Sequence, residues 1–250
     1  MPGNYLPKPY HTKLWRAIME FGLIDPDDRV LVGLSGGKDS AFMLYALNVL
    51  RGYSEVPFDL QAVTVDLGFT EPLDSASMGE YCGQLGVPYH VIKTQIADII
   101  DERSPKESPC AVCSFFRRAA MNRFAAREGF TKVALAHHLD DACETFLMNL
   151  LYSGRILALP WKTHLSRTGV TVIRPLLYFS EREVIRGTRL TGFEPVSNPC
   201  PHSGHSVRAR VRHLLRELSR ENKMVRANII SAMREGKPVE LWPPARRHRH

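Results

Sequence analysis

The sequence predicts an α/β fold: a doubly wound, mostly parallel sheet with helices on both faces, followed by a helical, basic C-terminal segment. Strand-like and helix-like apolar runs alternate along the chain, as a parallel sheet with crossover helices requires. The residues Ser-Gly-Gly-Lys-Asp-Ser at 35–40 join the first strand-like run to a helix-like run. In a chain of 250 residues, a hydrophobic content of 44% is enough for a large buried core.

Each element follows from its apolar spacing. Five short apolar runs predict strands at 29–34, 59–66, 89–93, 132–137 and 170–173. Five longer runs predict helices at 10–21, 41–50, 73–85, 140–152 and 181–190. Sheets of this kind bind ligands beyond the carboxyl ends of their strands, which is where the loop at 35–40 falls.

The loop at 35–40 predicts a phosphate or pyrophosphate site. Its glycine pair allows a tight turn that brings backbone N–H groups and a helix N-terminus to one point. A Walker loop would need glycine at Val32 and serine or threonine at Asp39, and the Gly-x-Gly-x-x-Gly fingerprint is also absent. The plainer interpretation is an ordinary glycine-rich turn. The favoured one assigns phosphate binding to Ser35, Gly36, Gly37, Lys38, Asp39 and Ser40.

A second polar cluster begins where the strand at 132–137 ends and the next helix opens. Asp140, Asp141 and Glu144 fall near the first turn, where carboxylates can simply stabilise the helix dipole. Beside a polyphosphate they would repel the ligand unless a divalent cation lay between them. We therefore predict a magnesium site at Asp39 and Asp141. His137 and Asp140 are predicted to lie at the nucleotide, although a histidine at a strand end is often only structural.

A third cluster consists of cysteines. Cys110 and Cys113 have Cys-x-x-Cys spacing at a predicted helix N-terminus, a setting that lowers thiol pKa values and suits binding of one metal or cluster. Together with Cys200 they leave three interpretations open. These are an iron–sulfur cluster with three protein thiolates, a structural zinc completed by His202 or His205, and a redox-active pair that carries a persulfide.

The other cysteines, Cys82 and Cys143, lie in apolar helical runs and are predicted to be core residues. Five cysteines, an odd number, in a chain without a signal-peptide pattern favour a reducing cytoplasm over a disulfide scaffold. No apolar stretch approaches the length that spans a membrane. The net charge of +7 and the pI of about 9.3 favour an anionic partner.

The motifs together resemble one family. The loop at 35–40, the Cys-x-x-Cys pair with its arginine pair, Ala-His-His-x-Asp-Asp, Ile-Arg-Pro-Leu and a late Pro-Cys occur in this order in the tRNA 2-thiocytidine synthetases (TtcA type), which are PP-loop ATP pyrophosphatases. The resemblance covers residues 10–205, most of the chain. It implies a cytoplasmic enzyme that uses ATP and Mg²⁺ to adenylate the 2-carbonyl oxygen of a tRNA cytidine, at position 32, before sulfur displaces AMP.

The resemblance also implies residue roles. Catalytic roles would fall to Asp39, Asp141, Cys110 and Cys113, and a 4Fe-4S cluster would be held by Cys110, Cys113 and Cys200 with its fourth iron free of protein ligands. The family often has a second late cysteine where Ser203 stands here, which leaves the three-cysteine set intact.

The implied organisation has three parts. An N-terminal helical segment covers 1–28, the PP-loop domain with its Cys-x-x-Cys insertion covers 29–195, and the late cysteine with basic helices covers 196–250. The implied partners are tRNA, a sulfur donor (a cysteine desulfurase or free sulfide) and a second copy in a homodimer. Phosphate contacts with RNA are expected from arginines whose plainer interpretation is a solvated helix face, namely Arg117, Arg118, Arg208, Arg212 and Arg216.

Other functions remain open at this point. A lysidine-type tRNA cytidine ligase also adenylates a cytidine 2-carbonyl and shares the Ala-His-His-Leu-Asp-Asp run, but it would not need the three cysteines. A zinc-stabilised RNA-binding protein with an inactive PP-loop would bind RNA without ATP turnover. A sulfurtransferase acting on a small molecule would keep the chemistry and change the acceptor.

Overall fold

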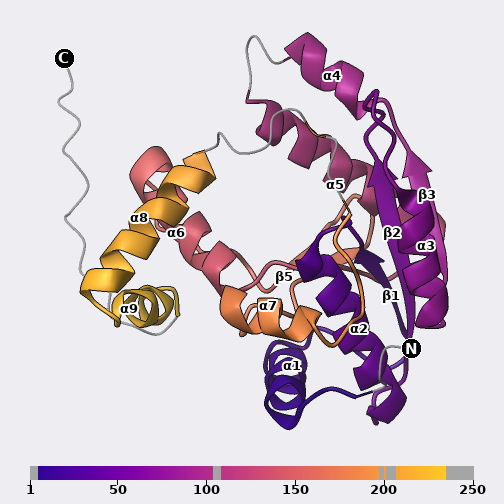
Figure 1. Cartoon of the computed structure of the whole chain (residues 1–250), viewed down its shortest axis with the longest axis horizontal. Helices are drawn as coiled ribbons and strands as arrows, with labels where there is room; N and C mark the ends of the chain where they lie inside the picture. The colour runs from indigo at the N-terminus through magenta and orange to yellow at the C-terminus, as the bar shows by residue number, and fades with distance from the viewer. Residues whose placement is uncertain (1–4, 104–107, 197–199, 201–206, 235–250) are drawn as a thin grey trace.

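The computed structural model describes residues 5–103, 108–196, 200 and 207–234. Its centre is a six-stranded sheet in the order β3-β2-β1-β4-β6-β5 (Figure 1). The strands are β1 Asp28–Gly33, β2 Phe58–Asp66, β3 Tyr89–Lys93, β4 Lys132–Ala134, β5 Lys162–His164 and β6 Thr171–Ile173. Neighbouring strands are parallel except β5 and β6, which are antiparallel. The predicted α/β class and mostly parallel sheet are confirmed.

Two features of the sheet differ from the prediction. The strand expected at 132–137 ends at Ala134, so residues 135–137 leave the sheet and form part of a pocket wall. The antiparallel strand β5 was not predicted. It is three residues long, polar and mostly exposed, so it carries no apolar period that a sequence pattern could reveal.

Five helices match the predicted runs: α1 Lys8–Phe21, α2 Lys38–Tyr53, α3 Ser75–Gln84, α6 Leu139–Ser153 and α7 Glu181–Thr188. The helix predicted to begin at the Cys-x-x-Cys pair is α5 Pro109–Arg127, and the predicted basic C-terminal helices are α8 Val207–Glu221 and α9 Val225–Ala232. The described chain adds α4 Ile96–Arg103. The two thiols of the Cys-x-x-Cys pair therefore lie in the first turn or so of α5, as expected from the sequence.

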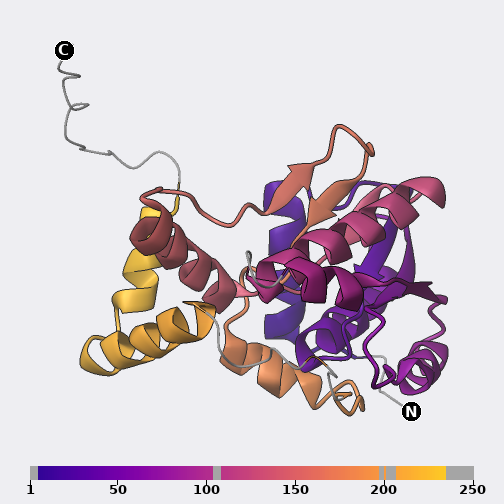
Figure 2. The ribbon, with the colours of Figure 1, turned by 90° about the horizontal axis from the view of Figure 1, so that it is seen from above.

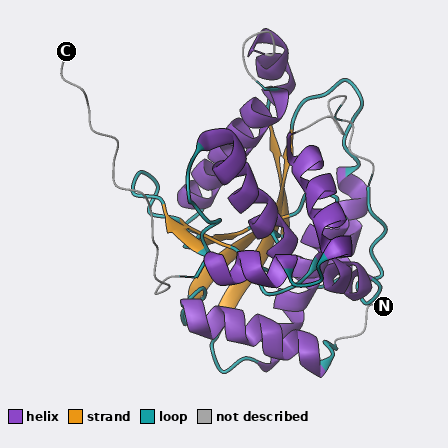
Figure 3. Cartoon of the chain, turned by 90° about the vertical axis from the view of Figure 1, so that its left-hand side faces the viewer, coloured by secondary structure: helices purple, strands orange, loops and turns teal. Residues whose placement is uncertain are grey.

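Helices cover both faces of the sheet (Figure 3). Side chains alternate along a strand, so Val30 and Val32 of β1 join the core formed with α1, α2, α3 and α7, whereas Leu31 joins the core formed with α4 and α5. Gly187 allows α7 to pack closely on α2, because a Cβ at that position would overlap the ring of Phe42.

The helices α6, α8 and α9 form a separate group beside the sheet (Figures 1 and 2). Their small core contains buried Cys143, Val211 and Leu215. Cys82 is buried in the main core, so the predicted core positions of both cysteines are confirmed. Among the described residues, no helix is long and apolar enough to cross a membrane.

Candidate active site

The loop at 35–40 links β1 to α2 and is held by its second serine. The hydroxyl of Ser40 donates to the carbonyl of Gly37 at 2.9 Å, accepts the N–H of Ser35 at 3.0 Å and lies 3.1 Å from the Ser35 hydroxyl. Gly36 has a φ of +77°, in the left-handed region where glycine carries no steric cost. The loop is thus fixed in an anion-binding shape at the start of a helix.

A pocket of about 330 Å³ opens beside this loop. Strand β1 pairs with β2 on one side and β4 on the other, and the chain changes direction across the sheet at this point. Ligands in open α/β sheets bind at such a switch point. Ser35, Asp39 and Ser40 form one wall, and the end of β2 (63–66) forms another.

The electrostatic content of the pocket suits a nucleotide that brings a divalent cation. Three guanidinium groups line it, from Arg117, Arg118 and Arg208. Three carboxylates line it as well, from Asp39, Asp66 and Asp141. A triphosphate alone would meet no net positive charge here, whereas Mg²⁺ between phosphate and carboxylates would balance both. The donor set therefore fits ATP with magnesium.

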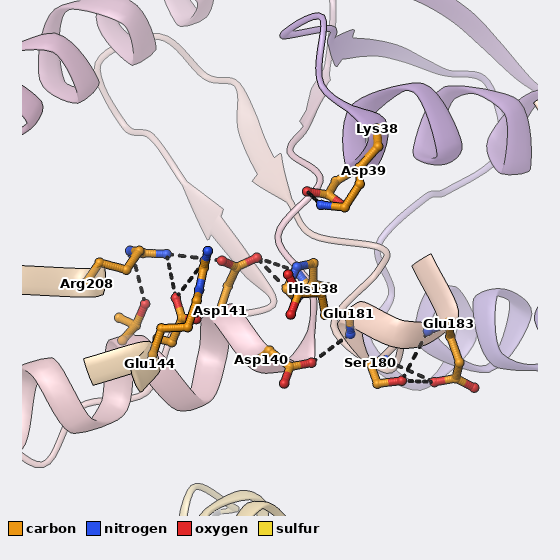
Figure 4. Close-up of polar contacts among 12 residues, drawn as sticks. Lys38, Asp39, His138, Asp140, Asp141, Glu144, Ser180, Glu181, Glu183 and Arg208 are labelled. Atoms are coloured by element: carbon orange, nitrogen blue, oxygen red, sulfur yellow. Dashed lines mark hydrogen bonds and ion pairs between the residues drawn. The ribbon is translucent and has the colours of Figure 1, made fainter. Parts of the chain in front are cut away.

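Asp39, in the first turn of α2, lines the pocket. Its carboxylate pairs with the Lys38 ammonium, with Nζ 3.1 Å from Oδ1 (Figure 4). Oδ1 is buried and has no hydrogen bond of good geometry within the described structure. Apart from the Lys38 ammonium, this buried oxygen has no well-aligned donor, so it is available to a further cation.

The adjacent residues Asp140 and Asp141 serve different parts of the structure. Asp141 lines the pocket, and its Oδ2 accepts the backbone N–H of His138 at 3.0 Å, as a helix-capping carboxylate does. Asp140 points the other way (Figure 4), where Oδ2 accepts the N–H of Glu181 at 2.7 Å and Oδ1 accepts from Arg226 at 2.7 Å. The structure places Asp141, but not Asp140, in the wall of this pocket.

His137 also lines the pocket. Burial lowers the pKa of His137 to about 4, outweighing the opposite effect of Asp141, so the ring is neutral near pH 7. Its Nδ1 is buried without a hydrogen-bond partner in the described residues. The ring thus presents an unused polar atom at the site.

Two of the arginines predicted to contact RNA, Arg208 and Arg212, form ion pairs with carboxylates of α6 in the protein without RNA. Arg208 donates to Asp141 Oδ1 at 3.2 Å and to the Thr145 hydroxyl at 3.3 Å. Arg212 donates from Nε to Glu144 Oε1 at 2.6 Å, and Glu144 is 2% exposed. These contacts dock α8 on α6 and bring Arg208 to the pocket.

On α5, Cys113 lies about one turn before Arg117 of the pocket wall, and Cys110 lies about two turns before it. Cys110 is exposed and Cys113 is half-buried. Desolvation raises the pKa of Cys113, and Arg117 opposes this while Cys200 and Cys110 add to it. The lowered pKa expected for a helix N-terminus is therefore wrong for Cys113, because burial outweighs the favourable charges. Because Cys200 affects the pKa of Cys113, Cys200 lies near the Cys-x-x-Cys pair.

A backbone contact attaches the late-cysteine region to the loop. Val196 donates its N–H to the carbonyl of Gly36 at 2.9 Å, four residues before Cys200. In the described part of the chain, no three His, Cys, Asp or Glu side chains are grouped to hold a single metal ion. Cluster ligands bind separate irons and need not meet at one point, whereas zinc ligands must. His202 and His205 lie outside the described residues.

Sequence reasoning missed part of the pocket wall. Met121 of α5 and the apolar end of β2 border the space, and Phe69 lines it beyond that strand. The strand at 59–66 was predicted, so the residues at its carboxyl end could have been assigned to the ligand site from the sequence.

The environment of Arg174 was also missed. Its sequence motif was noted, but the residue is buried, and desolvation and the nearby Arg118 lower its pKa to about 10.

The fold and this site define a PP-loop protein, and the PP-loop domain family model matches residues 9–218. The chain is 38% identical over 232 residues to the tRNA-cytidine(32) 2-sulfurtransferase of Geobacter metallireducens, covering 90% of this chain and 89% of that protein. It is 34% identical over 228 residues to the protein of the same name from Coxiella burnetii, covering 90% and 89%. The chain belongs to the family of tRNA-cytidine(32) 2-sulfurtransferases.

A solved structure supports the fold. The U34-tRNA thiolase NcsA from Methanococcus maripaludis with its [4Fe-4S] cluster aligns with a TM-score of 0.70, covering 90% of this chain and 76% of that one. The sequences are 24% identical, so the likeness concerns the arrangement of the chain.

Proposed function

We propose that this protein is an ATP-dependent tRNA sulfurtransferase that adenylates the 2-carbonyl oxygen of cytidine 32 and replaces it with sulfur, forming AMP and pyrophosphate. One observation carries the proposal: the structural elements that border the phosphate loop and the ATP pocket also hold the cysteine thiols. Helix α5 carries Cys113 and, one turn later, Arg117 in the pocket wall. The hydrogen bond from Val196 to Gly36 attaches the region of the third cysteine to the same loop.

The loop residues bind and orient ATP. Backbone N–H groups at 35–40 and the hydroxyls of Ser35 and Ser40 hold the leaving pyrophosphate, which leaves the α-phosphate exposed to attack. Asp39 and Asp141 would hold Mg²⁺, which would supply positive charge to the phosphates. Neutral His137 offers Nδ1, which has no partner among the described residues, for a hydrogen bond with the nucleotide without adding charge.

The tRNA base enters the same space. Its 2-carbonyl is reachable only when the base is unstacked, so the substrate is a loop nucleotide or one turned out of its stack. Adenylation converts a poor oxygen leaving group into AMP. Arg117 and Arg118 lie in the wall where negative charge develops and neutralise it.

Cys110, Cys113 and Cys200 would hold a 4Fe-4S cluster, which supplies an iron without a protein ligand for binding sulfur. All five cysteines are thiols, and these three are the ones that are not buried. Because burial raises the pKa of Cys113, that thiol is protonated at neutral pH and must release its proton when it becomes a ligand. The sulfur donor, the homodimer and the cytoplasmic location stay predictions.

The test measures iron, acid-labile sulfide and zinc in protein purified without oxygen, together with 2-thiocytidine in tRNA incubated with ATP and sulfide. We expect about four irons and four sulfides per chain. Cys200→Ser should lose both the metal and the product. Cys82→Ala, a change in the buried core, should keep both and serves as the control.

The alternatives give different results. One zinc without iron, with activity kept in Cys200→Ser, would contradict cluster-dependent thiolation. ATP-dependent attachment of lysine to the tRNA, independent of Cys200, would indicate a ligase. RNA binding without AMP formation would indicate a protein that has lost turnover.

A further inference from the structure

A second pocket, of about 630 Å³, lies between the start of α7 and the facing sides of α8 and α9. We call it the α7–α8 pocket. Its wall contains five cationic side chains, from Arg182, Arg216, Arg220, Lys223 and Arg226, and two carboxylates, from Asp140 and Glu181. None of these five cations lines the ATP pocket.

The two carboxylates are already engaged. Asp140 accepts from Arg226 at 2.7 Å and from the Glu181 backbone at 2.7 Å, and the Glu181 carboxylate lies 3.7 Å from Arg216. Five cations facing two anions leave a net charge of +3 in the wall. Within the described chain, the three remaining cations form no ion pair: Arg182, Arg220 and Lys223. A polyanion is the complement that such a wall requires.

Hydrogen bonds within the protein hold part of the pocket wall in place. Arg226 is held between Asp140 and the hydroxyl of Ser219, to which its Nη1 donates at 3.0 Å. Asp140 is 7% exposed and also fixes the first N–H of α7. One end of the pocket is therefore tied to α6, α7 and α8 together.

Four arginines of α8 form two sets with different partners. Arg208, Arg212, Arg216 and Arg220 recur every four residues and share one face of the helix. The first two bind Asp141 and Glu144 of α6, which occupies them within the protein. The last two line the α7–α8 pocket. The basic stripe is thus divided between docking the helix and facing a ligand.

The α7–α8 pocket adjoins the ATP pocket. Asp141 lines the ATP pocket and Asp140, the preceding residue, lines the α7–α8 pocket, so the first turn of α6 separates them. A helix is about 10 Å across, which is the scale of one or two nucleotides of a strand. A nucleic acid that places one base in the ATP pocket can therefore place neighbouring phosphates in the second.

We propose that the α7–α8 pocket binds phosphodiester groups of the tRNA strand that flanks the modified nucleotide. The proposal rests on the proposed function and adds a specific RNA anchor to it. Arg182, Arg220 and Lys223 contact phosphate oxygens, while Arg226 and Asp140 keep the pocket in place. The arginines bound to Asp141 and Glu144 do not form this anchor.

The test compares the variant Arg220→Ala/Lys223→Ala with wild type and with a matched control, Arg123→Ala/Arg167→Ala. Each variant loses two exposed positive charges, and the control residues line neither pocket. Binding of substrate tRNA is measured by fluorescence anisotropy across a salt series. Loss of two phosphate contacts should weaken binding about tenfold and reduce the slope of log K against log salt by about 1.4. ATP affinity, thermal stability and iron content should not change.

The outcomes are distinguishable. Weaker tRNA binding and a smaller salt slope in the pocket variant, but not in the control, support the anchor. Equal affinity and slope in the pocket variant and the control overturn it, while thiolation by wild type leaves the proposed function intact. Unchanged tRNA binding with weaker inhibition by added pyrophosphate would also overturn it, since the pocket would then bind the released product. If wild type binds no tRNA, the proposed function fails and the anchor fails with it.

Discussion

Arg208 at the start of α8 forms an ion pair with Asp141 in the first turn of α6, with Nη1 3.2 Å from Oδ1 (Figure 4). The other oxygen of Asp141 accepts the N–H of His138. Both oxygens of the proposed magnesium ligand are therefore in use before a nucleotide binds. If Asp141 holds Mg²⁺ as proposed, the ion would compete with Arg208 for Oδ1, and the guanidinium would remain in the wall of the ATP pocket. The position of α8 would then be coupled to the occupancy of the ATP site.

Removing this arginine should weaken nucleotide binding. Arg208→Ala takes away one of three guanidinium groups in the pocket, and a charge-assisted hydrogen bond contributes about 1.5–3 kcal/mol. We expect the Kd for MgATP to rise at least about tenfold, measured by isothermal titration calorimetry. Arg210→Ala, an exposed neighbour on α8, is the control. Tighter binding in Arg208→Ala would mean that the arginine mainly competes with magnesium.

Arg212 should matter for stability rather than for ATP. Its removal leaves the buried Glu144 carboxylate with only Arg208 nearby, at 3.8 Å. Breaking a fully buried pair costs about 3–5 kcal/mol, but the Arg212 side chain is 38% exposed, so we expect a loss of about 1–2 kcal/mol. Urea unfolding of Arg212→Ala measures this. The double variant with Glu144→Gln should recover part of the loss, and no recovery would show that the two residues do not interact.

Gly36 should be required for the shape of the loop. An alanine at φ +77° costs about 1–2 kcal/mol, and its Cβ would lie 3.3 Å from the Cβ of Val196. Gly36→Ala should lower the free energy of unfolding by this amount and weaken ATP binding. Gly37→Ala is the control, because Gly37 has a φ of −87° and an ordinary 3.4 Å contact to Ser35. Equal effects in both variants would contradict the role of the left-handed turn.

Stability should fall in acid because of His137. The unfolded state binds a proton at this residue below about pH 6.5, while burial lowers the folded pKa to about 4. Between these values the unfolded state holds more protons, so the stability present above pH 6.5 is lost as the pH falls toward 4. At about 1.4 kcal/mol per pKa unit, the loss reaches at most about 3 kcal/mol.

The check is urea unfolding of wild type and His137→Gln at pH 7.5, 6 and 5 in nucleotide-free protein. The other histidines contribute equally to both, so the difference between the two curves isolates His137. We expect the variant to lose less stability than wild type on acidification. Parallel curves would show that the ring is protonated as easily in the folded state as in the unfolded state.

Local patterns were enough to predict most of the sheet. The apolar runs that became β1, β2 and β3 are long enough to show their periodicity, and each was placed within one or two residues. The polar strand β5 was missed because a three-residue edge strand obtains its structure from pairing with β6, which leaves no signal in its own side chains.

In the functional site, too, features that depend on consecutive residues were predicted, and features that depend on packing were not. The loop at 35–40 was predicted because its function is built into consecutive residues: the turn, the hydroxyls and the helix start are all local. The pKa of Cys113 was predicted in the wrong direction because a helix N-terminus is visible in the sequence, whereas burial of the thiol depends on how α5 packs.

The fold class, the phosphate loop and the three cysteines that are not buried could be predicted before folding was considered, since each depends on short-range pattern and residue chemistry. Which charged groups meet could be seen only in the folded chain. Asp140 and Asp141 look equivalent in sequence, yet successive residues of a helix point about 100° apart, so one reaches the ATP pocket and the other the α7–α8 pocket. The arginines of α8 likewise divide between internal carboxylates and an open pocket, because their partners come from α6 and α7, which are distant in sequence and adjacent only after folding.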